Sequence, residues 1–174
     1  GTVYYIRAYA TNSIGTNYGQ QRQFTTKNGV VDVTTNAVSD IMAYTAKCGG
    51  TVTDDGGSAI TARGVCWSTS PNPTTGSVGK TTDGSGTGTF TSSIASLQPG
   101  TRYYVRAYVT NGVGTTYGNQ EEFTARNGIV TLTVNAPSSV AAATATAGGT
   151  IGDDGGAAVT ARGVCWGTSQ NPTT

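Results

Sequence analysis

Two pairs of adjacent aspartates, Asp54-Asp55 and Asp153-Asp154, are the acidic residues whose placement could support chemistry. Carboxylate oxygens are ligands that Ca²⁺ prefers. The surrounding sequence, Asp-Asp-Gly-Gly, is also a good polar turn and lacks the spaced third and fourth ligands of a calcium loop. Two acids on one loop do not flank a glycosidic bond from both sides, so they do not form a glycosidase pair. We expect a polar turn at each pair, with a weak Ca²⁺ site as the alternative and no other metal.

The remaining side chains offer little for catalysis. The chain has no histidine, which removes Ser–His and Cys–His nucleophilic catalysis and histidine-ligated metals. The glycine-rich segment 84–86 does not follow a strand and open a helix, so it is not a phosphate-binding loop. We therefore expect a protein that is not an enzyme and uses no cofactor.

The low charge of the chain argues against nucleic acid or an anionic membrane as a partner. Charged residues make up 11% of the sequence, and the formal net charge is +1. The 10 basic residues are scattered along the chain, so they form no basic patch that would attract phosphate groups. No apolar run is long enough to span a bilayer.

A repeat of 99 residues organises the chain. Residues 1–12 return at 100–111, and the offset continues without a gap to the last residue. Over the 75 positions that can be compared, 47 are identical. Most mismatches keep the apolar or polar character of the position, as Ile6 and Val105 do. Segments that agree this well are expected to fold alike.

Alternation with a period of two predicts strands through most of the repeat. In residues 102–111, the odd positions from Tyr103 to Val109 form an apolar face, and the even positions form a more polar face. Turn signals such as Asp83-Gly84 and Pro99-Gly100 separate these segments. Seven short strands in about 100 residues are typical of an antiparallel β-sandwich. We expect strands near 30–37, 42–53, 60–68, 78–83, 87–95, 102–111 and 116–125.

The segment Leu-Gln-Pro-Gly-Thr-Arg-Tyr-Tyr-Val-Arg-Ala at 97–107 resembles the E–F corner and strand F of fibronectin type III domains. In that family the tyrosine six residues after the leucine forms the tyrosine corner, and the matching residues are Tyr103 and, one repeat earlier, Tyr4. The sequence departs from ordinary members because strand B has no Trp and strand C carries Ala-Arg-Gly-Val-Cys-Trp at 62–67. That variant is similar to repeats of large bacterial secreted and cell-surface proteins of the adhesin or filament type.

The resemblance implies an all-β fold of tandem seven-stranded, fibronectin type III-like (immunoglobulin-like) sandwiches with a 99-residue repeat. Residues 1–28 would be strands F–G of one sandwich, 29–127 a complete sandwich, and 128–174 strands A–B–C of the next. Only the three residues 27–29, or 126–128, separate consecutive sandwiches, which is too few for a flexible tether. Adjacent units are therefore expected to abut as a stiff rod, each adding roughly 30–40 Å.

The three cysteines differ between the repeats: Cys48 is replaced by Ala147, whereas Cys66 and Cys165 correspond. In a fibronectin-like sandwich strands B and C lie in opposite sheets, so the resemblance implies that Cys48 and Cys66 could bridge the core. Such a disulfide would contribute about 3 kcal/mol by the loop-entropy model, and it would turn Val65 and Trp67 outward. Cys165 would remain an unpaired thiol. The alternative is two buried free thiols.

One expected surface combines aromatic and basic side chains. Tyr104, Arg106 and Tyr108 share the outward positions of one strand, and Trp67 is expected on the same face. Such a face binds sugar rings or proteins by stacking and cation–π contacts, or it only stabilises the sheet as a cross-strand ladder. The preceding repeat supplies the matching residues Tyr5, Arg7 and Tyr9.

These observations favour a structural segment of an extracellular bacterial stalk, filament or adhesin, in contact with adjacent repeats and with other copies in a filament. The first alternative is a module that binds a glycan or a surface protein through the Tyr–Arg–Tyr face. The second is a spacer in a secreted polysaccharide-degrading enzyme. The incomplete units at the two ends indicate a segment of a longer chain, and head-to-tail strand complementation between chains is the less favoured explanation.

Overall fold

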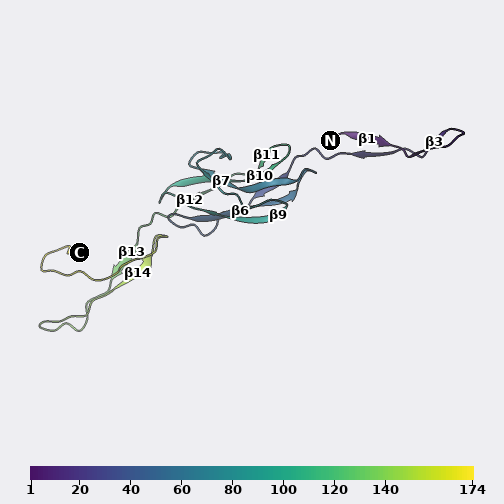
Figure 1. Cartoon of the computed structure of the whole chain (residues 1–174). Coiled ribbons are helices and arrows are strands. Elements are labelled where there is room, and N and C mark those ends of the chain that lie inside the picture. Colours follow the sequence, from purple (N-terminus) through teal and green to yellow (C-terminus); the bar gives the residue numbers. More distant parts are fainter.

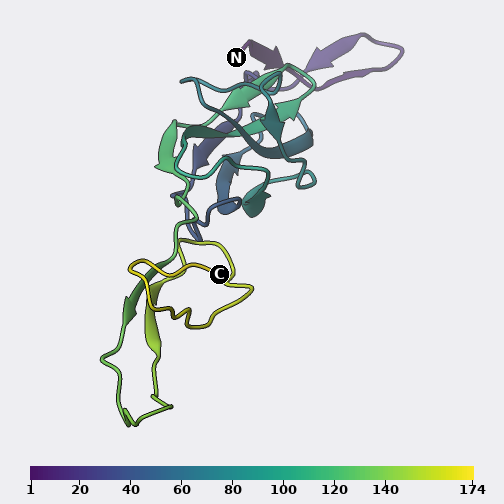
Figure 2. The same cartoon turned by 90° about the vertical axis from the view of Figure 1, so that its left-hand side faces the viewer.

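The structure, a computed structural model, describes residues 1–174 and contains strands and no helix. None of its elements is therefore a helix long and apolar enough to cross a membrane. Figure 1 shows three parts in an extended row, with a central sandwich between an N-terminal hairpin and a C-terminal segment. Figure 2 shows the same order after a 90° turn. The outer parts comprise β1 (Val3–Ile6), β2 (Tyr9–Thr11), β3 (Thr16–Tyr18), β4 (Arg22–Thr25), β13 (Thr131–Val134) and β14 (Gly149–Asp153).

Two antiparallel sheets form the central part. The first sheet has the order β5-β6-β9, and the second has the order β11-β10-β7-β8, with β12 also pairing with β10. The strand bounds are β5 (Asp32–Thr35), β6 (Ala46–Asp54), β7 (Ile60–Ser68), β8 (Gly79–Lys80), β9 (Gly88–Ile94), β10 (Arg102–Asn111), β11 (Thr115–Tyr117) and β12 (Glu121–Thr124).

One hydrophobic core lies between the two sheets. Val52 and Ile94 enter it from the first sheet, and Val65, Val105 and Val109 enter it from the second. Alternation along each strand brings these residues to one face while their neighbours point away. Because both inner faces contribute to the same cluster, the central part is an all-β sandwich.

The observed strands are shorter than the expected ones at several ends. β8 covers only two residues, although the amides of Thr81 and Asp83 continue to bond to the carbonyls of Val65 and Arg63 on β7. The expected last strand is split at 118–120 into β11 and β12. At the break, a Cβ atom on Gly118 would lie 2.7 Å from the Thr35 amide nitrogen. The chain therefore bends there against β5 of the other sheet.

The outer parts repeat the pairings of the central sandwich at an offset of 99 residues. Tyr4 pairs with Phe24 on β1 and β4, as Tyr103 pairs with Phe123 on β10 and β12. On the C-terminal side, Leu132 opposite Ile151 repeats Val33 opposite Val52, and the same register shift precedes both pairs. Equivalent sequence segments therefore adopt equivalent strand pairings.

Candidate functional site

The geometry that recurs in this molecule lies where one unit meets the next. We call the three connecting residues together with the Asp-Asp-Gly-Gly turn that they contact the junction: residues 27–29 with 54–57, and residues 126–128 with 153–156. At the first junction the amide of Gly29 donates a hydrogen bond of 3.0 Å to the carbonyl of Gly56. The Lys27 ammonium lies 2.6 Å from Asp54 Oδ1 and 4.0 Å from Asp55 Oδ1.

The second junction repeats each of these contacts. The amide of Gly128 donates to the carbonyl of Gly155, again over 3.0 Å. The Arg126 guanidinium forms ion pairs with Asp153 and Asp154. A basic residue in the connecting segment is thus bonded to the acidic turn of the unit that follows, in both places.

Glycine is required at the turn because of both its conformation and its neighbours. Gly56 has φ of 68° and Gly155 has φ of 70°, in the left-handed region that L-residues with a Cβ rarely adopt. A Cβ on Gly56 would lie 2.5 Å from the carbonyl carbon of Gly29, and one on Gly155 would lie 2.6 Å from that of Gly128. The turn and the connecting segment are therefore in direct backbone contact.

A third segment closes the first junction. Asn111, at the end of β10, donates from its Nδ2 to the carbonyl of Gly29 over 2.8 Å, and this side chain is buried. Val113 lies over Gly29, where a Cβ atom would come within 2.5 Å of Val113 Cγ2. The connecting segment is therefore held by two loops of the unit that it enters.

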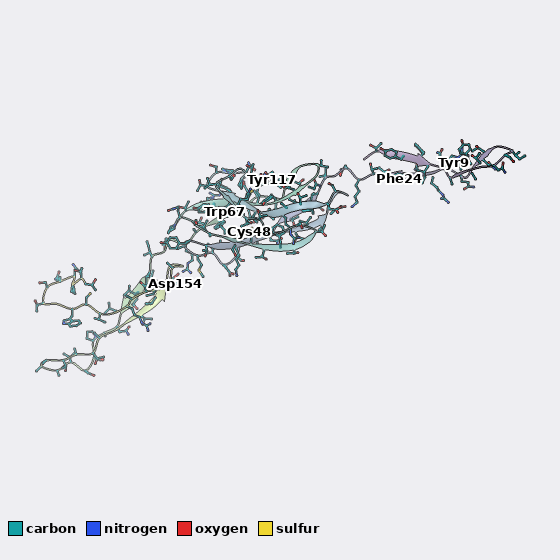
Figure 3. The ribbon with its side chains drawn as sticks, viewed as in Figure 1. Tyr9, Phe24, Cys48, Trp67, Tyr117 and Asp154 are labelled. Carbon is teal, nitrogen blue, oxygen red and sulfur yellow. The ribbon has the colours of Figure 1, made fainter.

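The second junction also shows the contact with the unit before it. The amide of Ala43 donates to the carbonyl of Gly156 over 2.9 Å, and the amide of Arg126 donates to the carbonyl of Met42 over 3.1 Å. The Asp-Asp-Gly-Gly turn of one unit is thus bonded to a loop of the preceding sandwich. Figure 3 shows Asp154 at this meeting point.

The ion pairs change the pKa of both partners at the first junction. The hydrogen bond from Lys27 and the amide of Gly56 lower the pKa of Asp54 below its ordinary value. The same pair raises the pKa of Lys27, chiefly through its hydrogen bond to Asp54. In the second junction the amide of Gly155, followed by Arg126, lowers the pKa of Asp153.

The carboxylates of both aspartate pairs accept hydrogen bonds from amides of their own turn. Oδ1 of Asp54 accepts from the Gly56 amide, and Oδ1 of Asp55 accepts from the Gly57 amide, at 2.8 and 2.7 Å. Asp153 and Asp154 accept from Gly155 and Gly156 in the same way, each at 2.7 Å. No group of three or more His, Cys, Asp or Glu side chains converges. The geometry is that of a polar turn bonded to a basic residue.

The expectation of a Cys48–Cys66 disulfide is wrong, and all three cysteines are free thiols. Cys48 lies in the core, but Cys66 is opposite Arg106 on the outer face of its sheet, where its thiol donates to the Arg106 carbonyl over 3.6 Å. The thiols therefore point to different sides of the second sheet. Burial raises the pKa of each to about 11. Cys165 is exposed.

The side chains of β7, the strand that carries Cys66, point to the opposite faces of the sheet from those expected. Val65 is fully buried in the core, and Trp67 packs against the same core. Their partners across the ladder, Ala107 and Val105, face the core as well. Trp67 therefore does not join Tyr104 on the outer face. Figure 3 labels it in the central part of the chain.

The expected Tyr–Arg–Tyr face is only partly open. Tyr108 is 3% exposed, and its hydroxyl donates to the carbonyl of Thr81 over 2.6 Å. The Arg106 guanidinium lies 4.8 Å from the centre of the Tyr117 ring and donates to the Gly118 carbonyl. Tyr104 is half-buried. The segment after β8 and the β11 strand thus cover most of this face.

The matching residues of the N-terminal hairpin are exposed. Tyr5 and Tyr9 are exposed, and Arg7 stacks over Tyr18 with its guanidinium 4.9 Å from the ring centre. Arg7 also donates to the Gly19 carbonyl over 2.9 Å, as Arg106 does to Gly118. The arginine–tyrosine stack is therefore a local property of this hairpin in both repeats.

The Tyr103 hydroxyl accepts a hydrogen bond of 2.9 Å from the amide of Gln98. This bond ties β10 back to the backbone just upstream, which is the contact that a tyrosine corner makes. Tyr103 also stacks on Phe123, with ring centres 5.7 Å apart. Tyr4 stacks on Phe24 at 5.5 Å in the N-terminal hairpin.

Sequence reasoning expected close junctions but did not identify the residues that make them. Lys27, Gly29 and Asn111 were not expected to have a role in the contact. The available signal was the recurrence of Lys-Asn-Gly and Arg-Asn-Gly in the two connecting segments, each a basic residue opposite a recurring acidic pair.

The fold and these junctions define an all-β sandwich chain whose units are joined by short, bonded connections. No protein-family model and no curated protein matches the chain. It is similar to the sensor domain of the anti-sigma factor RsgI4 in Pseudobacteroides cellulosolvens, with 23% identity over 55% of this chain and 93% of that chain and a TM-score of 0.41. It is also similar to a crystal structure of domains A168–A170 from titin, with 22% identity over 71% of this chain and 40% of that chain and a TM-score of 0.35. Likenesses this low carry no argument about what this chain binds or does.

Proposed function

We propose that this chain is a structural repeat segment of an extracellular bacterial stalk, filament or adhesin. Its units are fibronectin type III-like sandwiches of seven strands with a 99-residue repeat, divided at 1–28, 29–127 and 128–174. Each unit sets the distance and direction of the next, and the chain performs no turnover. The bacterial surface context comes from the resemblance of the repeat sequence.

The observation that carries this proposal is that the two junctions make the same contacts. The same amide-to-carbonyl bond, of 3.0 Å in both, joins Gly29 to Gly56 and Gly128 to Gly155. A basic side chain pairs with the acidic turn beside each bond. A flexible linker between independent domains has no such bonds, because it leaves its backbone solvated. The ion pairs cross from each preceding unit to the next, and the Ala43 amide also bonds to the Gly156 carbonyl across the second junction. These contacts between units support a stiff rod.

The outer Tyr–Arg–Tyr face supports a binding role less well. Tyr108 is buried by its own chain, and Arg106 is already stacked and hydrogen bonded. A stacking platform for sugar rings needs accessible ring faces. We therefore propose that the repeat provides length and contact between adjacent units, in preference to binding glycans.

Small-angle scattering from chains with increasing numbers of complete 99-residue units tests the proposal. A stiff rod grows by a constant length of roughly 30–40 Å for each unit. Flexibly linked domains grow more slowly, with about the square root of their number. Growth of the second kind would overturn the proposal, as would a reproducible catalytic rate from the purified protein.

A further inference from the structure

The hydrogen bonds of β6, the central strand of the first sheet, show which backbone groups of its neighbour β9 remain unpaired. The amide and carbonyl of Lys47 both bond to Ser39, and the carbonyl of Gly49 accepts from the Asn36 amide, so these residues direct their backbone groups toward the β5 side. In an antiparallel ladder such groups alternate between the two sides. The residues between them, Cys48 and Gly50, therefore bond to the other neighbour, β9.

On β9 the same alternation separates bonded from unbonded residues. Cys48 is opposite Ser92 and Gly50 is opposite Phe90, so these two residues of β9 bond to β6. Thr89, Thr91 and Ser93 then direct their amides and carbonyls to the outer edge of the sheet, where no hydrogen bond is made to them. Their side chains are exposed. β9 is thus a free edge of seven residues.

The other strand edges of the sandwich are protected. On β5, the Thr35 amide donates to Asn119 Oδ1, and the Thr35 hydroxyl donates to the Asn119 carbonyl. β8 is two residues long and carries Lys80. The last edge is broken between β11 and β12 and carries Glu121 and Glu122. Short strands, charges and covering side chains are the devices that keep strand edges from pairing with other chains.

β9 has none of these devices. Its sequence, Gly-Thr-Phe-Thr-Ser-Ser-Ile, contains no charge and no proline, and residues 84–98 as a whole contain no charged side chain. We propose that β9 is an interaction edge that pairs antiparallel with β9 of a second copy of this chain. The inference stands on this edge alone and does not depend on the stalk proposal.

The chemistry of the edge fits a second copy. A two-fold pairing centred on Thr91 sets Thr91 opposite the partner's Thr91 and Thr89 opposite the partner's Ser93, and it uses the free amides and carbonyls of all three residues. Each facing pair is then hydroxyl against hydroxyl, which is a favourable cross-strand combination, and no like charges meet. A single strand pair buries less than a standard interface, so the association is weak and visible only at high protein concentration.

Sedimentation equilibrium over a wide range of protein concentration tests the proposal with three variants of the full chain. Thr91→Pro removes an edge amide without removing a bond to β6, and Thr91→Lys places two positive charges opposite each other. Thr34→Lys is the matched control, because it puts the same charge on an exposed threonine of the same sheet but on β5. Thr91→Lys keeps the test valid should the proline variant fold poorly.

The expected result is that the wild-type chain and Thr34→Lys self-associate with similar dissociation constants, whereas both Thr91 variants weaken association at least tenfold. Amide exchange at Thr89 and Ser93 should slow as the wild-type concentration rises and stay fast in the Thr91 variants. A wild-type chain that stays monomeric at every concentration overturns the proposal. So does self-association that the Thr91 variants leave unchanged, which would locate it on another surface.

Discussion

The amide of Gly29 and the carbonyl of Gly56 are hydrogen bonded across 3.0 Å, so the residue that connects two units is bonded to a turn more than twenty residues further along the chain. This bond fixes the connecting segment before the first strand of the sandwich begins. Gly128 and Gly155 repeat this bond. The basic residue just before it, Lys27 or Arg126, forms the ion pair that links the end of the preceding unit to the turn in each repeat.

Gly56→Ala should destabilise the sandwich by about 2–3 kcal/mol, because it adds both left-handed backbone strain and a contact with Gly29. Gly84→Ala is the control: Gly84 also has positive φ, of 100°, but a Cβ there would meet nothing within 4 Å. Gly84→Ala should therefore lower the free energy of unfolding by the backbone strain alone, about 1–2 kcal/mol. Urea unfolding measures both variants, and equal losses would show that the junction contact contributes nothing.

Lys27→Ala should raise the pKa of Asp54 toward its ordinary value, since the Lys27 hydrogen bond is the main cause of its lowered pKa. A lowered carboxyl pKa stabilises the fold above the unfolded pKa, and that stabilisation is lost as the pH falls through the folded value. The pKa of Lys27 is raised, so the stability that its ion pair contributes is lost as the pH rises through that raised pKa. The ion pair should thus be intact between about pH 4 and pH 10.

Carboxyl-carbon NMR titration of Asp54 checks this prediction. Lys47→Ala is the control, because Lys47 pairs with Asp40, 2.8 Å away, and takes no part in the junction. An Asp54 pKa that stays low in Lys27→Ala, or that rises equally in Lys47→Ala, would assign the shift to another cause. The pair is exposed, so added salt should weaken it in the wild-type chain.

The sequence predicted the facing of β10 correctly and that of β7 incorrectly, and the reason is physical. On β10 the aliphatic residues Val105, Ala107 and Val109 fall on alternate positions, so the pattern indicates which face enters the core. The expected facing of β7 followed from the expected Cys48–Cys66 disulfide, which the structure does not contain. The alternation of β7 alone does not specify its facing, because Arg63 shares the inward face with Val65. Its guanidinium lies 5.1 Å from the centre of the Phe90 ring and donates to three carbonyls at 86–88. A shift of one residue reverses every side chain of a strand.

The burial of Tyr108 could not be predicted from the strand pattern. Its cover comes from Thr81 and Thr82, which follow β8 and reach its hydroxyl across the sheet. Alternation specifies which face a side chain occupies, but it does not specify what else packs on that face. The same limit applies to the junctions, whose contacts join Gly29 to residues of two other loops.

Alkylation should modify one thiol in the folded protein and three after unfolding without reductant, because all three cysteines are free and only Cys165 is exposed. Burial and a pKa of about 11 keep Cys48 and Cys66 from forming thiolate near neutral pH. Intact mass spectrometry counts the adducts. A single adduct in denaturant would instead require a Cys48–Cys66 bond.

Tyr103→Phe should destabilise the sandwich by about 1–2 kcal/mol, because it leaves the Gln98 amide without the acceptor that now lies 2.9 Å away. The ring remains, so its stacking on Phe123 is preserved and the loss reports the hydroxyl alone. Tyr104→Phe is the matched control on the opposite face of the same strand, where the side chain is half-buried and its hydroxyl makes no hydrogen bond within the protein. It should change the free energy of unfolding by less than about 0.5 kcal/mol.

Urea unfolding of the two tyrosine variants separates the hydroxyl's role from that of the ring. The midpoint should fall for Tyr103→Phe while the denaturant slope stays constant, because the same surface is exposed on unfolding. Equal midpoints for Tyr103→Phe and Tyr104→Phe would mean that the Gln98 bond adds no stability, and that ring packing alone holds β10 against the upstream backbone. A larger loss in Tyr104→Phe would place the stabilising contact on the outer face instead.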